Sequence, residues 1–391
     1  MNNLVSLSYL DSYNVANIEE CLRASMEELK LFGKLRPKMK VLIKPSLPVS
    51  ESQDKAKTTH PAIVRAIVNI LSKMGVTCVV ADSPYKKYSR TNLDQVYLNT
   101  GMLEVANLTT CELNRNLKTF KMDIPNGIKA KHLTLLDVVN DVDAIINVGK
   151  ININENLGYM GACSNLFGLI PGELKSIVLN RLSTLKDYNH YLLDMYHALK
   201  NKIAFNILDG IVALEHGEVQ RMLYCLGVSE NMFSLDASIL DILNIKHENT
   251  ILKQANEREF INIDKPYKLV GEDIEKFKVQ DFVLNEVCQD TKINPSDKAK
   301  AQYFKSNQQR VKIEPNKCKG CSVCMKACPT GAIMMKYDKN GELYASIDYS
   351  KCVFCFKCHE TCPYKVVEVE TPQKYKALKK DFDKYNYEQD T

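Results

Sequence analysis

The sequence predicts a large α/β domain with a mostly parallel sheet and flanking helices, followed by a small α+β domain. Two observations predict this division. Over residues 1–289, apolar runs of strand type alternate with segments whose apolar residues recur at helical spacing, which is typical of βαβ units. Eight of the 14 cysteines then fall within residues 318–362. A chain of 391 residues also exceeds what one core usually holds, so two domains are expected.

The large domain begins with a predicted strand over residues 39–43 that ends at Lys44-Pro45. A helix is expected over residues 61–74, because Pro61 suits its first turn and Gly75 ends it. Further buried strands are predicted over residues 76–81, 144–148 and 203–208. Each of these ends at a turn signal, namely Asp82-Ser83-Pro84, Gly149-Lys150 and Asp209-Gly210.

Charged side chains follow four of the predicted strands, at Lys44, Asp82, Lys150 and Asp209. Ligands of open α/β sheets bind outside the carboxyl ends of the strands, so these side chains are candidates for one crevice. Turn chemistry alone also accounts for such residues, and for Asp209 we favour that interpretation. For Lys44 and Lys150 both interpretations stay open.

The clustered cysteines form two copies of the spacing C-x2-C-x2-C-x3-C, each followed by proline. The copies are Cys318, Cys321, Cys324, Cys328 and Cys352, Cys355, Cys358, Cys362. Zinc sites more usually show two separated C-x2-C pairs, and disulfide frameworks suit small secreted chains. The doubled run is instead the one that binds 4Fe-4S clusters in bacterial ferredoxins. The sequence therefore predicts two 4Fe-4S clusters.

On these cysteines, residues 311–371 resemble a bacterial two-cluster ferredoxin. The resemblance implies that the last cysteine of each run binds the other cluster. One cluster would then take Cys318, Cys321, Cys324 and Cys362, and the other Cys352, Cys355, Cys358 and Cys328. Between the runs, Asn340-Gly341 predicts a hairpin with positive φ at both positions. Residues 290–310 are polar and predict a linker, and residues 372–391 predict an amphipathic helical tail.

Composition and charge exclude several classes of protein. With 52 basic and 47 acidic residues the net charge is only +5, which does not favour nucleic-acid binding. We expect no membrane span, because no stretch approaches 18 apolar residues. We also expect no signal peptide, because residues 1–14 lack a basic region followed by an apolar run. Iron-binding thiolates need reducing conditions, so a cytoplasmic location is expected, in an anaerobic or microaerobic host.

The large domain resembles a bacterial and archaeal family known as domain of unknown function 362, over about residues 4–282. The motifs that carry the resemblance are Val41-Leu42-Ile43-Lys44-Pro45, Thr59-His60-Pro61, Ala81-Asp82-Ser83-Pro84, the run from Ser164 to Gly172 with Lys175, Leu208-Asp209-Gly210-Ile211 with Glu215, then Asp236, and Val270-Gly271-Glu272.

The chain departs from the family pattern at three places. Lys150-Ile151-Asn152 stands where the family usually has Lys-Thr-His, Ser164 replaces a common lysine, and the usual Gly-Pro after Glu215 is missing. Residue chemistry still permits a site. Lys44, Lys150 and Lys175 are candidates for a cationic pocket that binds an anionic small molecule, with Asp82 and Glu215 as acid or base groups near them.

Three functions remain open at this point. The first is a reductase-type iron–sulfur oxidoreductase, in which the clusters pass electrons to or from a ligand site in the α/β domain. The second is a non-enzymatic electron carrier or partner-docking protein, and the third is a cluster-based sensor or assembly factor. A redox partner protein is expected for electron transfer, and the substrate stays unknown.

Overall fold

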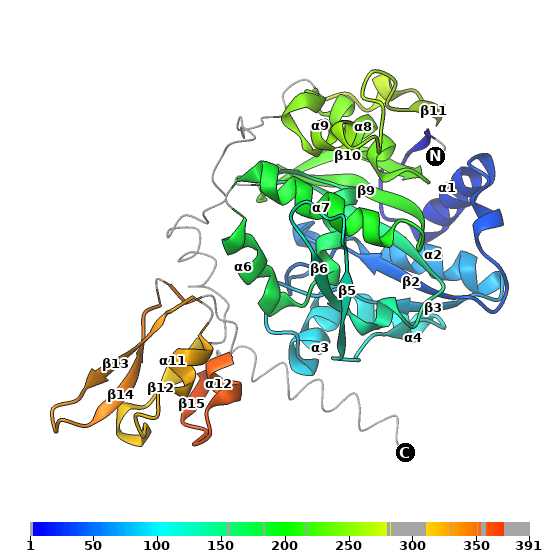
Figure 1. The fold of residues 1–391 in the computed structure, drawn as a ribbon. Coiled ribbons are helices and arrows are strands. Elements are labelled where there is room, and N and C mark those ends of the chain that lie inside the picture. The colour runs from blue at the N-terminus through cyan, green and yellow to red at the C-terminus, as the bar shows by residue number, and fades with distance from the viewer. Residues whose placement is uncertain are drawn as a thin grey trace, which may run out of the picture. The chain divides into compact units, whose positions relative to one another are not determined.

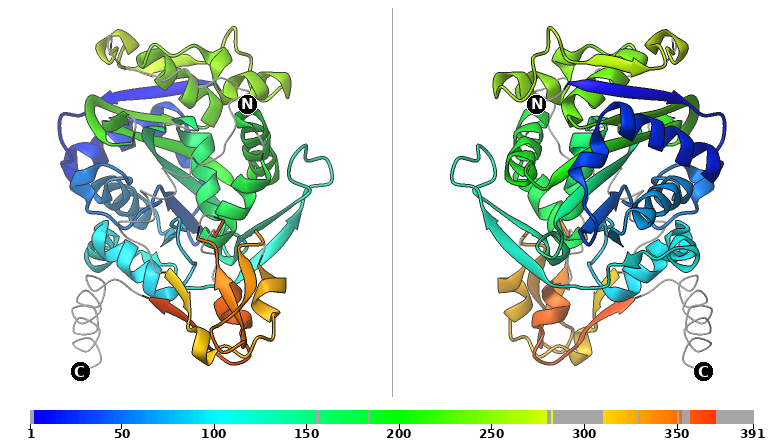
Figure 2. Two further views of the ribbon diagram at one scale, coloured as in Figure 1. Left: turned by 90° about the vertical axis from the view of Figure 1, so that its left-hand side faces the viewer. Right: turned by 90° about the vertical axis from the view of Figure 1, so that its right-hand side faces the viewer.

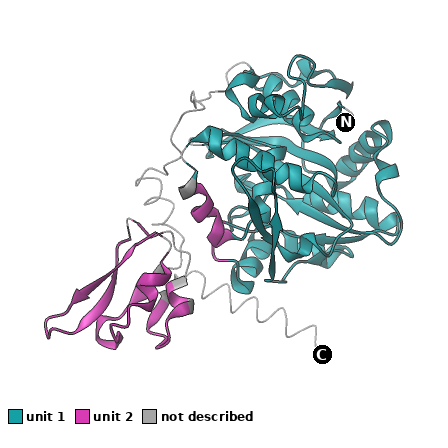
Figure 3. Ribbon diagram, viewed as in Figure 1, with its two compact units in different colours: residues 1–84, 88–171, 182–293 teal, residues 85–87, 172–181, 294–391 magenta. Residues whose placement is uncertain are grey.

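The computed structural model describes residues 3–154, 157–182, 184–215, 217–279, 282, 310–328, 330–349, 351–352 and 357–370. The chain divides into two compact units (Figure 3). Unit 1 comprises residues 1–84, 88–171 and 182–293, and unit 2 comprises residues 85–87, 172–181 and 294–391. The predicted tail, residues 372–391, lies outside the described residues. So does the predicted linker, residues 290–310, apart from Arg310.

The strands of unit 1 are β1 (Leu4–Tyr9), β2 (Lys40–Pro45), β3 (Thr77–Val80), β4 (Glu112–Leu113), β5 (Thr119–Asp123), β6 (His132–Leu136), β7 (Ala144–Asn154), β8 (Gly158–Met160), β9 (Ile203–Glu215), β10 (Val219–Ser229) and β11 (Lys268–Gly271). The described residues place nine of them in one sheet of order β11-β1-β10-β9-β7-β2-β3-β4, with β8 beside β7 (Figure 1). β5 and β6 form a separate hairpin.

The sheet is mostly parallel, as predicted. β9, β7, β2, β3 and β4 run in one direction, and β10 is antiparallel to both of its neighbours. Along the chain, β2 is followed by β3 on one side, whereas β7 later pairs on its other side. The strand order therefore reverses between β2 and β7, which is the topological switch point where ligands of such sheets usually bind.

Helices cover both faces of this sheet. In Figure 2 the blue helices α1 and α2 lie on one side and the green helix α7 on the other. The predicted helix over residues 61–74 is confirmed as α2, with His60 as its N-cap and Gly75 in the left-handed region after its end. The described helices of unit 1 are α1 (Val15–Glu28), α2 (Pro61–Lys73), α3 (Arg90–Asn99), α4 (Met102–Leu108), α5 (Ala162–Asn165), α7 (Leu185–Leu199), α8 (Met232–Ile242) and α9 (Ile251–Glu257).

Two predicted strand ends were wrong. Residues 144–148 and 203–208 were expected to stop at Gly149-Lys150 and Asp209-Gly210, but β7 continues to Asn154 and β9 to Glu215. Lys150 lies opposite Asp209 in the β7–β9 ladder, and Gly210 lies opposite Cys225 of β10. Pairing with neighbouring strands satisfies the backbone groups here, so it overrides the local turn signal.

Unit 2 contains the predicted cysteine-rich module. Its core consists of Val311, Ile313, Cys324, Ile333, Ala345, Cys358 and Val367. Of the predicted turn residues, only Gly341 adopts a positive φ, because Asp338 closes the hairpin by accepting the N–H groups of Asn340 and Glu342. The described elements are α6 (Gly172–Arg181), β12 (Arg310–Ile313), α11 (Val323–Ala327), β13 (Ile333–Tyr337), β14 (Leu343–Ile347), α12 (Lys357–Thr361) and β15 (Val367–Glu370).

In the ranges that the structure describes, no helix combines the length and the apolar character needed to cross a membrane.

Candidate functional site

Four thiols of unit 2 surround one cavity. Cys318, Cys321 and Cys324 of the first run and Cys362 of the second line a space of about 320 Å³ that is partly open to solvent. Within the described residues, no three cysteine, histidine or carboxylate side chains meet closely enough to hold a single metal ion. The thiols instead enclose a volume, which suits a cubane cluster held by four cysteines.

The loop that carries the first three thiols is fixed by its backbone. Gly320 has a φ of +62°, and a Cβ atom there would lie 2.7 Å from the carbonyl oxygen of Leu343. Only glycine satisfies both conditions without strain. Ser322 also lies in the left-handed region, directly before α11. The chain therefore turns sharply between Cys318 and Cys324, so that nearby cysteines point toward one space.

The electrostatics of this cavity favour a cationic occupant. Burial raises the pKa of the Cys324 thiol, and the nearby Cys318, Cys321 and Cys362 raise it further. Thiolates are the form that binds metal, and several of them in a partly buried space repel one another. Positively charged iron offsets this repulsion, so the donor set fits an iron–sulfur cluster.

Part of the second predicted ligand set is also visible. Cys358 belongs to the core of unit 2, and Cys328 and Cys352 pack against that core. The Sγ atom of Cys328 accepts the N–H of Ala332 at 3.3 Å. Cys355 lies outside the described residues. The structure thus describes three of the four cysteines that the ferredoxin resemblance assigns to the second cluster.

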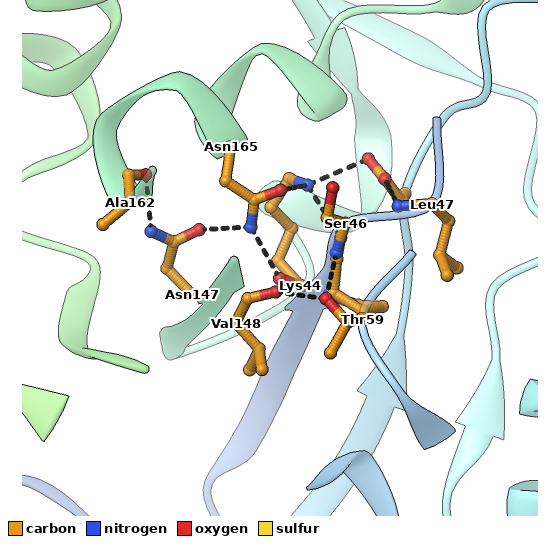
Figure 4. A network of polar contacts seen from close by, with 10 residues as sticks. Lys44, Ser46, Leu47, Thr59, Asn147, Val148, Ala162 and Asn165 are labelled. Atoms are coloured by element: carbon orange, nitrogen blue, oxygen red, sulfur yellow. Dashed lines mark hydrogen bonds and ion pairs between the residues drawn. The ribbon is translucent and has the colours of Figure 1, made fainter. Parts of the chain in front are cut away.

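In unit 1, Lys44 lies at the topological switch point and is fully buried. Its Nζ atom donates to Asp82 Oδ1 at 3.0 Å, to Asn165 Oδ1 at 3.0 Å and to the carbonyl oxygen of Pro45 at 2.9 Å (Figure 4). These three contacts use all the donors of an ammonium group. Burial lowers the pKa of Lys44, and the charge of Asp82 opposes that shift.

A chain of buried amides extends this network across the sheet. The Nδ2 atom of Asn165 donates to Asn147 Oδ1 at 2.8 Å, and Asn147 donates to the carbonyl oxygen of Ala162 (Figure 4). Asn147 also donates to Asn206 Oδ1 at 3.0 Å. Neither Asn147 nor Asn206 was predicted from the sequence. The sequence did contain a signal, since each is a single asparagine inside an otherwise apolar strand run. A buried amide needs hydrogen-bond partners, so such a residue indicates a polar network inside the domain.

Gly168 packs directly against the Lys44–Asp82 ion pair. A Cβ atom at this position would overlap Oδ1 of Asp82 and Nζ of Lys44. The carbonyl oxygen of Gly168 also accepts the N–H of Ser83 at 3.0 Å. The Leu-Phe-Gly motif therefore packs directly on the ion pair, which leaves the space at the end of β2 filled by the chain itself.

Lys150 belongs to a second network on the same sheet. Its Nζ donates to Asp209 Oδ2 and to the Tyr13 hydroxyl, both at 2.9 Å. The Tyr13 hydroxyl donates to Asp209 Oδ1 at 2.8 Å, and the His60 backbone N–H donates to Asp209 Oδ2 at 3.1 Å. Asp209 is thus an ion-pair partner, contrary to our preference for a turn role. Nothing in the local sequence signalled Tyr13.

The rings of Tyr13 and His60 stack with centroids 3.7 Å apart. Burial and the Asp209 carboxylate raise the pKa of Tyr13. Burial lowers the pKa of His60 to about 4. The Nδ1 atom of His60 accepts the N–H of Ala62, so the neutral ring caps α2. Tyr13 and His60 are half-buried, whereas Lys150 and Asp209 are buried, so the two rings form the more exposed part of the network.

The third predicted lysine has different surroundings. Lys175 of α6 is buried, and its Nζ lies 4.7 Å from the ring centroid of Tyr85, a cation–π contact. Glu215 pairs with Arg221 at 2.6 Å. The structure therefore pairs Lys44 with Asp82 and Lys150 with Asp209, whereas Lys175 contacts Tyr85. Each of the three lysines thus contacts different residues.

A second cavity lies in unit 1, beside Asp236. The carboxylate accepts the N–H groups of Ala162 and Cys163 and the hydroxyl of Tyr159. Burial nevertheless raises its pKa to about 6. The cavity, of about 390 Å³ with part of it open to solvent, is also lined by Ser164, at the position where the sequence departs from the family pattern.

Comparisons with known proteins find matches to two separate ranges of the chain. Residues 41–241 match the family described as domain of unknown function (DUF362), and residues 317–366 match a 4Fe-4S dicluster domain. The thylakoid-associated protein sll1697 of Synechocystis sp. is 28% identical over 270 residues, which cover 66% of this chain and 80% of that protein.

Among solved structures, the lactate racemase apoprotein of Thermoanaerobacterium thermosaccharolyticum is similar at 12% identity with a TM-score of 0.38. The match covers 62% of this chain and 57% of the racemase chain. The chain thus spans less than two thirds of that protein, and a similarity at this level carries no argument about activity.

We expect Gly168→Ala to destabilise unit 1 by about 3 kcal/mol, because the added methyl group displaces one member of a buried ion pair. Gly33→Ala is the matched control, since a Cβ atom there meets nothing within 4 Å. Urea unfolding followed by circular dichroism measures both. Equal midpoints for the two variants would contradict the close packing of Gly168 on Lys44 and Asp82.

The low pKa of His60 predicts a pH dependence of stability. The unfolded chain binds the imidazole proton near pH 6.5, whereas the folded chain does so only near pH 4. This contribution is therefore complete above pH 6.5 and is lost as pH falls toward 4. His60→Asn keeps a good N-cap without titrating there, so its stability should fall less over this range.

The exposed His132 on β6 supplies the control for this experiment. Thermal melting at a series of pH values should give parallel curves for the wild type and His132→Asn. A His60→Asn curve that also runs parallel to the wild type would mean that the imidazole is not held neutral by the fold.

Proposed function

We propose that this protein, which belongs to the DUF362 family and carries a 4Fe-4S dicluster domain, holds two 4Fe-4S clusters in unit 2. The 4Fe-4S domain makes it an iron–sulfur protein of the electron-transfer type. The observation that carries the proposal is the cavity in which Cys362 joins three cysteines of the first run. A run that served only its own cluster would not bring Cys362 to that space.

Each residue set has a definite role in this proposal. Cys318, Cys321, Cys324 and Cys362 hold the first cluster, and Cys352, Cys355, Cys358 and Cys328 hold the second. A bound cluster supplies a site that gains or loses one electron at a time. The Ala332 N–H at Cys328 Sγ stabilises negative charge on that sulfur, which raises the potential of the attached cluster. The apolar core of unit 2 limits the access of water.

We further propose a reductase-type role, in which the clusters exchange electrons with a small molecule bound by the α/β unit. The network of Tyr13, His60, Lys150 and Asp209 supports this role. It lies where Lys150 and Asp209 face each other in the β7–β9 ladder, and its Tyr13 and His60 residues are only half-buried. Burial lowers the pKa of Lys150, which makes its ammonium group a better proton donor. Lys44 and Asp82 then act as structural supports, because their contacts are complete.

One observation favours a second candidate, an electron carrier without a substrate. Lys44 and Lys150 are each paired with a buried carboxylate, so neither offers an unshared positive charge to an anionic ligand. The two roles differ in a measurable respect. A reductase re-oxidises its clusters faster when its substrate is added, whereas a carrier responds only to a partner protein.

Anaerobic purification should yield about eight iron atoms and eight sulfides per chain, because each of two cubanes contains four of each. Chemical analysis of iron and acid-labile sulfide measures both, and electron paramagnetic resonance after reduction should show interacting spins. About four of each, with the same yield after reconstitution, would reduce the proposal to a single cluster.

Cys362→Ser should damage the cluster held by the first run, because its thiolate closes that set. Its spectrum after reduction should match that of Cys318→Ser and differ from that of Cys352→Ser. Cys21→Ser is the control, since Cys21 lies on α1 in unit 1, and it should keep both clusters. A Cys362→Ser spectrum that matches Cys352→Ser would show that each run binds its own cluster.

A further inference from the structure

The cavity lined by Cys318, Cys321, Cys324 and Cys362 opens to solvent on an identifiable face of unit 2. Cys321 is exposed, and Lys319 and Tyr364 also line the opening. Any role of this face in electron exchange rests on the proposed function, since it concerns the first of the two clusters. Electron transfer rates fall steeply with distance, so an open cavity is the natural place for exchange with another molecule.

Exposed apolar side chains lie at this opening, in the case of Tyr364, and directly beside Cys324 in the chain, in the case of Val323 and Met325. Tyr364 is 54% exposed, and Val323 and Met325, which follow the cysteine loop on α11, are 38% and 36% exposed. Single exposed apolar residues are ordinary, whereas several beside one functional opening indicate a contact surface. We call Lys319, Val323, Met325, Lys326 and Tyr364 the port face.

Among the described residues of unit 2, the two lysines of the port face have no ion-pair partner. Elsewhere in this module Lys312 pairs with Glu314, Lys317 with Glu368 and Lys351 with Asp348. In contrast, Lys319 and Lys326 are exposed, and no carboxylate among the residues described in unit 2 lies within ion-pair distance of them.

We propose that the port face docks an acidic electron-transfer protein, which exchanges electrons with the cluster of Cys318, Cys321, Cys324 and Cys362. When the partner is the donor, one electron leaves its reduced centre, which is oxidised, and reduces the cluster, with no bond made or broken. The reverse transfer uses the same contact. Uncompensated lysines attract an acidic surface over several ångströms, and the apolar residues exclude water once it has docked.

Two small redox reagents of opposite charge test whether Lys319 and Lys326 attract negatively charged molecules to the port face. The dithionite-reduced protein is oxidised by ferricyanide or by hexaammineruthenium(III) in a stopped-flow spectrophotometer at several ionic strengths. Lys319→Glu/Lys326→Glu should slow the ferricyanide reaction roughly tenfold at low salt and accelerate the ruthenium reaction. The difference should vanish at high salt, because exposed charges are then screened.

The matched control is Lys336→Glu/Lys339→Glu, which makes the same change of charge on the exposed hairpin of β13 and β14. It should alter the ferricyanide rate by less than about twofold. Equal effects of the two double variants would overturn the proposal, because the preference would then reflect only the overall charge. An unchanged rate in Lys319→Glu/Lys326→Glu would overturn it as well.

A binding measurement on the wild-type protein needs no variant. Flavodoxin, an acidic electron-transfer protein, is mixed with the anaerobic holoprotein and a carbodiimide that joins lysines to carboxylates. Cross-links at Lys319 and Lys326, lost at high salt, support the port face. Cross-links confined to other lysines, or the absence of any, overturn it.

Iron and sulfide analysis of the same samples separates the two possible failures. Wild-type protein without clusters would contradict the proposed function itself. Full cluster content with no effect of Lys319 and Lys326 would remove only the port face.

Discussion

Four thiolates must meet around one compact cluster, and this requirement governs unit 2. Cys318 and Cys362 belong to different runs, yet both line the same cavity. The strands that flank the two runs bring them together, because β12 pairs with β15 along Val311–Val369 and Ile313–Val367. The hairpin of β13 and β14 spans the segment between the runs. Strand pairing thus closes the ends of the module, and the thiols are left facing a common interior.

A different constraint shapes unit 1. Ionised groups inside a protein are costly unless paired and fully hydrogen-bonded, and the carboxyl side of this sheet contains two such pairs. Lys44 and Asp82 meet beside Asn165, while Lys150 and Asp209 meet beside Tyr13. Each pair joins neighbouring strands or the segments after them. The networks therefore specify strand order and register as well as the polarity of this edge.

The two networks differ in what they leave open. Around Lys44 the chain fills the switch point with its own groups, and Gly168 is packed so closely that no side chain fits. Around Lys150 the outer layer is a stacked Tyr13–His60 pair that is only partly covered. Accessibility, rather than the presence of charge, distinguishes a structural pair from a candidate site. For this reason the ligand site that we propose lies at Lys150 and not at Lys44.

The sequence by itself determined the features that depend on local spacing. These are the doubled cysteine run, the alternation of strands and helices, and the capped start of α2 at His60-Pro61. It did not determine which side chains meet. Tyr13 and Asp209 are 196 residues apart and Lys44 and Asn165 are 121 apart, and their contacts depend on strand order. The continuation of β9 through Gly210 likewise required its partner β10. Local patterns record the conformational preference of a short segment, whereas these contacts arise only when the sheet has assembled.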